Sequence, residues 1–268
     1  MPFFSWLDLA KIFHKFRREF RSICLKEIVK EEYHKWHSQY FEHEFEMLVF
    51  GSGGHPLIIF PALNESFFEL KDNGIIESAS NLLDSGKIKI YCPQSIDYLT
   101  WNNRSIAPAD RAKSYTGYEN VVLFDIIDFA RHETGKEKAA LAGFNFGAYH
   151  AANISFKHPD LVDALICLDG IFDIKNFLDG YYDDNCYFNN PPDYLPGLKD
   201  NWYLDRIKKI KIILEAGEIN QNSRQTKIIS GLLDSKDVGH KLDFRPNFGD
   251  DWDFWCEVFP QYLQQIFE

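Results

Sequence analysis

The stretch Gly143-Phe-Asn-Phe-Gly147 constrains the fold of this chain more than any other segment. It follows a short apolar run, residues 139–142, and precedes residues 148–152, which favour a helix. A strand followed directly by a helix requires a sharp turn, and glycine and asparagine are common in such turns. Asparagine tolerates positive φ better than any common residue except glycine. The pattern therefore predicts a strand, a sharp turn at Asn145 and a helix.

Length, composition and charge limit the class of protein. A chain of 268 residues, 45% of them hydrophobic, suits one large α/β domain with a substantial core. Aromatic residues reach 16%, which we interpret as a bulky core rather than an aromatic binding surface. The net charge of -11 argues against nucleic acid as a partner.

The cysteines and the start of the chain bear on the cellular compartment. An odd number of widely spaced cysteines without a C-x-x-C pair argues for reduced thiols and against a disulfide frame or a zinc site. No apolar run approaches the roughly 18 residues of a membrane span, and charged residues near the start interrupt any signal peptide. We expect a cytoplasmic protein without a cofactor. The cysteines are Cys24, Cys92, Cys167, Cys186 and Cys256.

Residues 1–27 differ from the rest of the chain. Apolar residues recur there at helical spacing, and six basic residues oppose two acidic ones up to residue 26. Such a basic amphipathic helix could dock on its own domain, pair with another subunit or lie on an anionic membrane. We favour docking or self-association, and thus a homo-oligomer or a protein partner, with peripheral membrane contact as the alternative. The predicted contact residues are Phe13, Phe16, Phe20, Arg17, Arg18 and Arg21.

Short apolar runs alternate with helix-like segments along residues 28–268. This alternation predicts one parallel sheet with helical crossover connections. Residues 176–203 interrupt it, because they are rich in Asn, Asp, Pro and Tyr and have no clean period. We expect a lid-like insertion without regular structure there. The predicted strands are 45–50, 56–61, 88–92, 139–142, 165–168 and 210–214, and the predicted helices are 75–83 and 118–131.

Five segments in series resemble the esterase D-like family of α/β-hydrolases. The resemblance covers residues 28 to 268 and implies an α/β-hydrolase fold, with a mostly parallel eight-stranded sheet flanked by helices. It also implies a serine esterase with a Ser-acid-His triad. The segments are "EEYHKWHSQYFEHEFEMLVFG" (31–51), "YCPQSIDYLTWNN" (91–103), "YHAANISFKHPDLVDALICLDGIFD" (149–173), "GYYDDNCYFNNPPDYLP" (180–196) and "DDWDFW" (250–255).

All three triad positions implied by the resemblance are substituted. The serine of the G-x-S-x-G nucleophile elbow falls on Asn145, the acid on Asn220 of "AGEIN", and the histidine on Asp250 of "GDDWDFW". An amide nitrogen is a poor nucleophile because its lone pair is delocalised into the carbonyl. Asn220 has no charge to stabilise an imidazolium, and the ordinary aspartate pKa of about 3.9 suits a general base poorly. Together the substitutions predict that hydrolysis is lost.

Two alternatives remain open at this stage. An active acyl hydrolase needs a displaced nucleophile or base, for which we considered Cys92, Cys167, Ser66, Ser95, His55, His150 and His240; each is better explained as a core, loop or surface residue. Conversion of Asn145 to an aspartate nucleophile by deamidation is disfavoured, because phenylalanine follows it and not glycine.

The other alternative is a small-molecule sensor that uses a retained oxyanion hole. The backbone N–H of Phe146 and a second donor near Leu63 would supply that hole. We interpret the acidic residues near the rim, Glu218, Asp250, Asp251 and Asp253, as solvated rather than as a metal site. The predicted pocket residues are Phe146, Leu63, Asn64, Asp97, Trp101 and Trp252. The leading hypothesis is a catalytically inactive, esterase-like protein that acts in binding or assembly.

Overall fold

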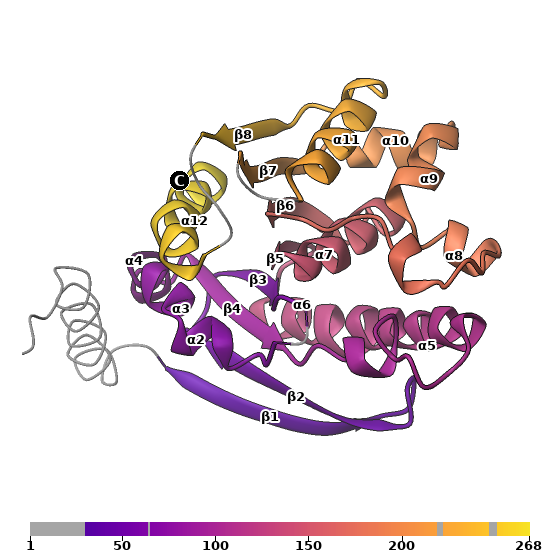
Figure 1. Ribbon diagram of the computed structural model, residues 1–268. Coiled ribbons are helices and arrows are strands. Elements are labelled where there is room, and N and C mark those ends of the chain that lie inside the picture. The colour runs from indigo at the N-terminus through magenta and orange to yellow at the C-terminus, as the bar shows by residue number, and fades with distance from the viewer. Residues whose placement is uncertain (1–29, 64, 219–221, 247–250) are drawn as a thin grey trace, which may run out of the picture.

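The structure, a computed structural model, describes residues 30–63, 65–218, 222–246 and 251–268. In these residues, eight strands form one sheet in the order β1-β2-β4-β3-β5-β6-β7-β8 (Figure 1). β2 is antiparallel to both of its neighbours, and all other neighbouring strands are parallel. The predicted sheet is therefore confirmed, whereas the predicted helix in residues 1–27 lies outside the described residues. The strands are β1 (Glu31–Ser38), β2 (His43–Phe50), β3 (His55–Phe60), β4 (Ile88–Pro93), β5 (Ala139–Phe144), β6 (Val162–Leu168), β7 (Lys211–Gly217) and β8 (Lys241–Arg245).

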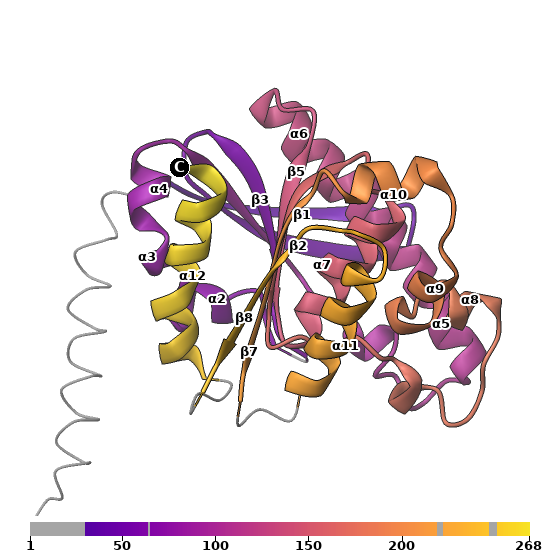
Figure 2. The same cartoon turned by 90° about the horizontal axis from the view of Figure 1, so that it is seen from above.

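Helices cover both faces of the sheet. α12 and α2 to α4 pack on one face, and α5 to α7 with α9 to α11 lie on the other (Figure 2). Because both faces are covered, the central strands β4 and β5 are buried along their whole length. The helices are α2 (Glu69–Asp72), α3 (Ile75–Ser78), α4 (Ser80–Asp84), α5 (Pro108–Asn120), α6 (Asp128–Thr134), α7 (Phe146–Lys157), α8 (Asp184–Tyr187), α9 (Pro191–Gly197), α10 (Asn201–Ile207), α11 (Ser223–Asp234) and α12 (Trp252–Phe267).

Strand β1 was not predicted from the residue pattern. It lies at the edge of the sheet and pairs with β2 along its whole length. Its side chains alternate between exposed and partly buried, and most of them are charged or polar. A strand of this kind lacks the apolar run that marks a buried strand, because only one of its faces contacts the core.

The helix predicted at 118–131 begins ten residues earlier than expected. α5 starts at Pro108 and continues through a π-helical segment, η2 (Val121–Ile127), into α6. Proline fits the first turn of a helix, where its missing N–H has no partner to lose. Arg111 and Glu119 lie on the buried face of α5. These two charges interrupt the apolar periodicity that would otherwise have revealed the helix.

Residues 176–203 are not without regular structure, contrary to the prediction. They contain α8, α9, the start of α10 and the end of a 3₁₀ turn, η3 (Lys175–Phe177). The side chain of Asp183 caps α8 by accepting from the N–H of Cys186, and that of Asp200 caps α10 by accepting from the N–H of Trp202. Helices of four to seven residues are too short to show a clear period.

Candidate functional site

Asn145 alone forms the turn between β5 and α7. Its backbone has φ 53° and ψ -115°, a conformation that residues other than glycine rarely adopt. Its N–H donates to the carbonyl of Leu168 at 2.9 Å, and its carbonyl accepts from the N–H of Ile171 at 3.2 Å. The end of β6 thus holds the turn in place, and the side chain of Asn145 stays partly exposed. The strand, turn and helix predicted from the sequence are all present.

Two glycines allow β5 and α7 to approach each other at this turn. A Cβ atom on Gly143 would lie 2.1 Å from the carbonyl carbon of Gly147, and one on Gly147 would lie 2.3 Å from the carbonyl oxygen of Phe60. Both contacts are with backbone, which has little freedom to move away. Close packing of backbone on backbone therefore explains the glycines on either side of Asn145.

The side chain of Asn145 caps the helix that follows it. Its Oδ1 accepts a hydrogen bond from the backbone N–H of Phe146 at 2.9 Å. Asparagine is among the best N-cap residues because its amide oxygen satisfies an N–H that has no partner within the helix. The sequence predicts that this N–H contributes to an oxyanion hole; in the structure it donates to the side chain of Asn145. The ring of Phe146 is buried and stacks on Tyr149.

Asp97 and Trp101, which we expected at the pocket, are interior residues. Asp97 is 2% exposed; its two oxygens accept from Ser95 Oγ at 2.6 Å and contact His150 Nε2 at 2.9 Å. Trp101 is fully buried, and its Nε1 donates to the hydroxyl of Tyr149 at 3.0 Å. Both side chains tie the segment after β4 to α7 beneath the elbow.

The remaining predicted pocket residues are spread over two layers. Leu63 is partly buried against the core on the α7 side, and Trp252 packs on the other side, where its ring centroid lies 6.0 Å from that of Phe144. The other predicted site residues lie outside the described residues: Asn64, Asn220, Asp250, Phe13, Phe16, Phe20, Arg17, Arg18 and Arg21.

Two buried carboxylates near the carboxyl ends of β6 and β7 were not predicted. Asp169 follows β6, is 1% exposed and accepts from Asn222 Nδ2 at 3.1 Å. Glu215 in β7 is fully buried, and neither of its carboxylate oxygens has a hydrogen-bond partner in the described residues. Burial, reinforced by the nearby charges of Asp169 and Asp243, raises the pKa of Glu215 to about 8. A single carboxylate in the otherwise apolar run of residues 212–216 was the available signal.

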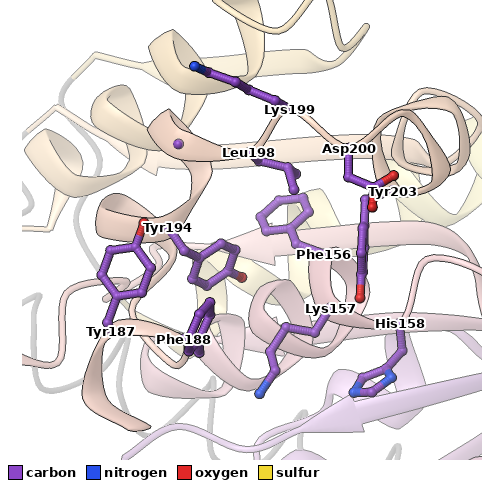
Figure 3. Close-up of a pocket in the computed structure, with 11 residues that line it drawn as sticks. Phe156, Lys157, His158, Tyr187, Phe188, Tyr194, Leu198, Lys199, Asp200 and Tyr203 are labelled. Atoms are coloured by element: carbon purple, nitrogen blue, oxygen red, sulfur yellow. The ribbon is translucent and has the colours of Figure 1, made fainter. Parts of the chain in front are cut away.

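Two cavities in the described residues lie away from Asn145. The larger, about 580 Å³, opens at the C-terminal end of α7, beside Phe156 and His158 (Figure 3). The smaller, about 260 Å³, lies between the start of α11 and the loop around Asp173. Asn145 lines neither cavity, so the elbow and the larger of these two cavities are separate features.

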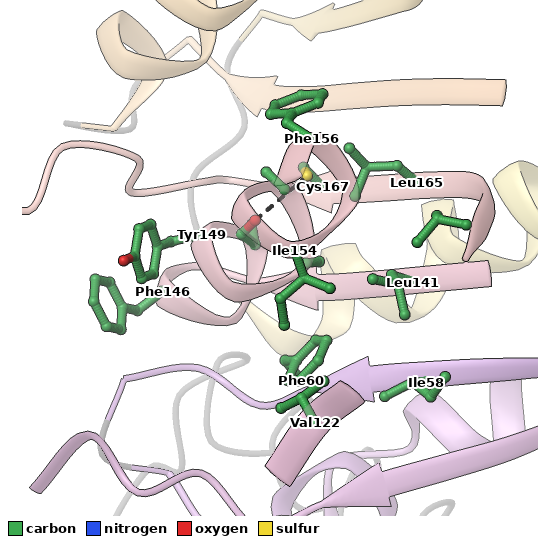
Figure 4. Close-up of a cluster of buried hydrophobic side chains, with 14 of the residues drawn as sticks. Ile58, Phe60, Val122, Leu141, Phe146, Tyr149, Ile154, Phe156, Leu165 and Cys167 are labelled. Atoms are coloured by element: carbon green, nitrogen blue, oxygen red, sulfur yellow. Dashed lines mark hydrogen bonds between the residues drawn. The ribbon is translucent and has the colours of Figure 1, made fainter. Parts of the chain in front are cut away.

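The structure also places the candidates for a displaced nucleophile. Cys92 and Cys167 are fully buried, and burial raises the pKa of each thiol far above its usual range. Figure 4 shows Cys167 packed beneath α7 with its Sγ directed at the carbonyl of Ala148. Ser66 is exposed in the loop after β3, and its Oγ accepts from the N–H of Phe68. None of these three side chains forms a hydrogen bond with a histidine in the described residues.

The histidines that we considered as bases serve other contacts. His150 is buried beside Asp97, and His55 Nε2 lies 3.0 Å from Oδ1 of Asp163. His240 Nε2 lies 2.7 Å from Ser230 Oγ. His240 directly precedes β8, the edge strand, whereas Asn145 follows the carboxyl end of β5 in the middle of the sheet. The described residues contain no cluster of three or more His, Cys, Asp or Glu side chains arranged to hold a metal ion, and no helix there could cross a bilayer.

Comparison with known proteins identifies the fold. No protein-family model matches the sequence, and no curated protein sequence matches it significantly. A ferulic acid esterase superposes with a TM-score of 0.71 at 15% identity, over 89% of this chain and 98% of its own. S-formylglutathione hydrolases from Agrobacterium tumefaciens and Staphylococcus aureus superpose with TM-scores of 0.70 and 0.66, at 10% and 12% identity. Each superposition covers 90% of this chain. It covers 96% of the Agrobacterium tumefaciens protein and 97% of the Staphylococcus aureus protein.

Identities this low establish a common architecture and leave the activity open. The strand order, the strained turn at Asn145 and the superpositions agree with one another. The chain has the α/β-hydrolase fold.

Proposed function

We propose that this chain is a pseudo-hydrolase: a protein with an esterase-like fold that has lost serine-type ester hydrolysis and acts by binding or assembly. The observation that carries the proposal is the state of the elbow. The residue in the nucleophile position is an asparagine, and its amide oxygen accepts from the N–H of Phe146 at 2.9 Å. Proteins with the same fold are named as an esterase and a hydrolase, and ester hydrolysis is the activity that we propose this chain has lost.

The turn at Asn145 lacks the chemical groups that two steps of ester hydrolysis require. Attack requires a hydroxyl or thiol that a neighbouring base can deprotonate, and the Asn145 amide offers neither. Stabilisation of the tetrahedral intermediate requires backbone N–H groups that are free to bind the oxyanion. At Phe146 that donor is already taken by the Asn145 side chain. The substitutions at Asn220 and Asp250, read from the sequence, remove the acid and the base as well.

The basic amphipathic segment at the N-terminus is the part of the chain that we propose to contact a partner. Phe13, Phe16 and Phe20 recur at helical spacing, and Arg17, Arg18 and Arg21 add positive charge to an otherwise acidic protein. A second copy of the acidic domain is electrostatically complementary to this segment. We therefore propose a homo-oligomer or a complex with an acidic protein partner.

The catalytic half of the proposal is tested by hydrolysis of p-nitrophenyl acetate. We expect wild type, Asn145→Ala and Asn145→Ser to give the buffer rate, and a fluorophosphonate probe to label none of them. Asn145→Ser is the sharper variant, because it restores the hydroxyl without the other two triad members. Turnover in wild type would overturn the proposal. Loss of that turnover in Asn145→Ala would then assign the chemistry to Asn145. Turnover that persists in Asn145→Ala would indicate a displaced nucleophile.

The assembly half is tested on the full-length chain by light scattering after size-exclusion chromatography. Reversing the charge at Arg17, Arg18 and Arg21 to glutamate should dissociate the oligomer. Reversal of Lys208 and Lys209, two lysines on the folded domain, provides the control. An unchanged mass after the arginine reversals contradicts the assembly role. Sedimentation with anionic phospholipid vesicles that is lost in the same variant would assign the segment to a membrane instead.

A further inference from the structure

The cavity of about 580 Å³ lies at the opposite end of α7 from Asn145. A helix of 12 residues is about 18 Å long, so the cavity is a site of its own rather than a part of the elbow. Its walls come from the end of α7, from α8 and α9, and from the start of α10 (Figure 3). The volume falls within the range of pockets that enclose small organic ligands.

Aromatic rings dominate the walls. Phe156 comes from α7, Tyr187 from α8, Tyr194 from α9 and Tyr203 from α10, and Phe188 follows α8 directly. Phe188 is 57% exposed, the largest exposure among the large hydrophobic residues that the structure describes. Exposure of this apolar ring to water is unfavourable in free energy, and an apolar ligand that covered the ring would remove that cost.

The wall residues are fixed by contacts outside the cavity. The hydroxyl of Tyr194 donates to Asn153 Oδ1 at 3.1 Å, and Asn153 is fully buried in α7. The Asp183 cap holds α8, and with it Tyr187 and Phe188, whose rings meet edge to face at 5.0 Å. The rings are thus arranged before any ligand arrives, which lowers the entropic cost of binding.

The polar groups of the cavity cancel in charge. Glu119, which is 6% exposed, accepts from Lys157 and lies 2.7 Å from His158 Nε2. Burial would raise the pKa of Glu119, but the His158 hydrogen bond and the Lys157 charge outweigh it and lower that pKa. Lys199 and Asp200 add one charge of each sign to the lining residues. The cavity therefore offers no net charge to attract an ion.

Hydrogen-bonding capacity remains on three wall residues. In the described residues, the hydroxyls of Tyr187 and Tyr203 make no hydrogen bond, and neither does the Nδ1 atom of His158, whose other ring nitrogen contacts Glu119. In Figure 3 the hydroxyl of Tyr203 points toward His158. These groups suit a ligand that carries a hydroxyl or carbonyl group on an apolar body.

We propose that this cavity binds an uncharged, planar aromatic molecule with a hydroxyl or carbonyl substituent. Flat rings stack between the aromatic walls, and the substituent reaches Tyr203 and His158. A saturated molecule of equal size loses the stacking, and a charged one has no counter-charge. This site is independent of the elbow, so it stands whether or not the chain hydrolyses esters.

The test is calorimetric titration of the full-length protein with 2-naphthol and its analogues. We expect saturable binding with one site per chain. Decahydro-2-naphthol, which is not planar, should bind at least about fivefold more weakly, because aromatic pairs add affinity beyond their buried area. Naphthalene, which lacks the hydroxyl, and 2-naphthoate, which is charged, should also bind more weakly.

Three variants locate the binding. Phe188→Ala removes an exposed wall, and Leu198→Trp fills the cavity; each should weaken 2-naphthol binding at least about fivefold. Phe124→Ala is the matched control, because Phe124 is 50% exposed on η2, beside Tyr40, and is not among the lining residues of the cavity. Equal affinity in all three variants, or no saturable binding to wild type, overturns the proposal.

Two further outcomes also contradict it. Binding that is lost in Asn145→Ala and kept in Phe188→Ala would place the ligand at the elbow. A dimer that dissociates in Phe188→Ala, without any naphthol binding, would assign the surface to a second copy of the chain.

Discussion

His150 Nε2 lies 2.9 Å from Oδ1 of Asp97, and Ser95 Oγ donates to the other oxygen of the same carboxylate at 2.6 Å. His150 is fully buried and Asp97 is 2% exposed. The aspartate lies between the serine and the histidine, so the imidazole has no access to the serine hydroxyl through this contact. The order differs from that of a catalytic triad, in which histidine is central. The three residues instead join the segment after β4 to α7.

Replacing His150 with leucine should destabilise the fold strongly. The change leaves the buried Asp97 carboxylate with Ser95 as its remaining side-chain partner, and taking a hydrogen-bond partner from a buried carboxylate costs about 1–3 kcal/mol or more. Urea denaturation measures the loss. Adding Asp97→Asn to the variant removes the orphaned charge and should recover part of it. An unchanged unfolding midpoint in His150→Leu contradicts the structural role of this pair.

Gly147→Ala should be among the most damaging alanine substitutions in the chain. The new Cβ would lie 2.3 Å from the carbonyl oxygen of Phe60, and backbone on both sides has to shift. We expect a loss of about 3 kcal/mol or more in the free energy of unfolding. Gly231→Ala in α11 is the matched control, since nothing lies within 4 Å of its Cβ position; there alanine should stabilise by about 1 kcal/mol. Similar midpoints for both variants would show that the close approach is absent.

Asn145→Ala should destabilise the protein by about 1–2 kcal/mol, because it removes the cap on Phe146 and keeps the positive φ. Asn145→Asp keeps an acceptor at the same place, and its charge is favourable at a helix N-terminus. We therefore expect its thermal midpoint to match wild type. Two equally destabilised variants would mean that the side-chain oxygen of Asn145 does not cap α7.

Glu215→Gln should remove a pH dependence of stability. The pKa of Glu215 is about 8 in the folded protein, against 4.5 for an ordinary glutamate. Between these values the folded state holds a proton that the unfolded state releases, so the contribution of Glu215 to stability falls as pH rises. Glutamine does not titrate. The variant should equal wild type near pH 4.5 and exceed it near pH 8 by an amount on the order of 2–4 kcal/mol.

Chemical denaturation at pH 4.5, 6, 7 and 8 measures this difference. Glu257→Gln is the control, since Glu257 is exposed on α12. A difference that is constant with pH would mean that Glu215 is ionised in the folded protein.

The turn at Asn145 could be predicted because its determinants are local. Two glycines, one asparagine and an apolar run lie within nine residues, and the strain at the turn selects residues that tolerate positive φ. The apolar strands could be predicted for a similar reason, since burial on both faces leaves a continuous run. β1 and the first half of α5 escaped prediction because they carry polar residues on faces that contact other elements.

The sequence by itself therefore determined the sheet, the elbow and the absence of a serine at its centre. Only the tertiary structure decided that the Asn145 oxygen accepts from Phe146, that Glu215 is buried beside Asp243, and that four elements enclose an aromatic cavity. The physical reason is the range of the interactions. A periodic pattern records how a segment is buried, whereas a hydrogen-bond partner or a cavity wall depends on residues brought together by folding from distant parts of the chain.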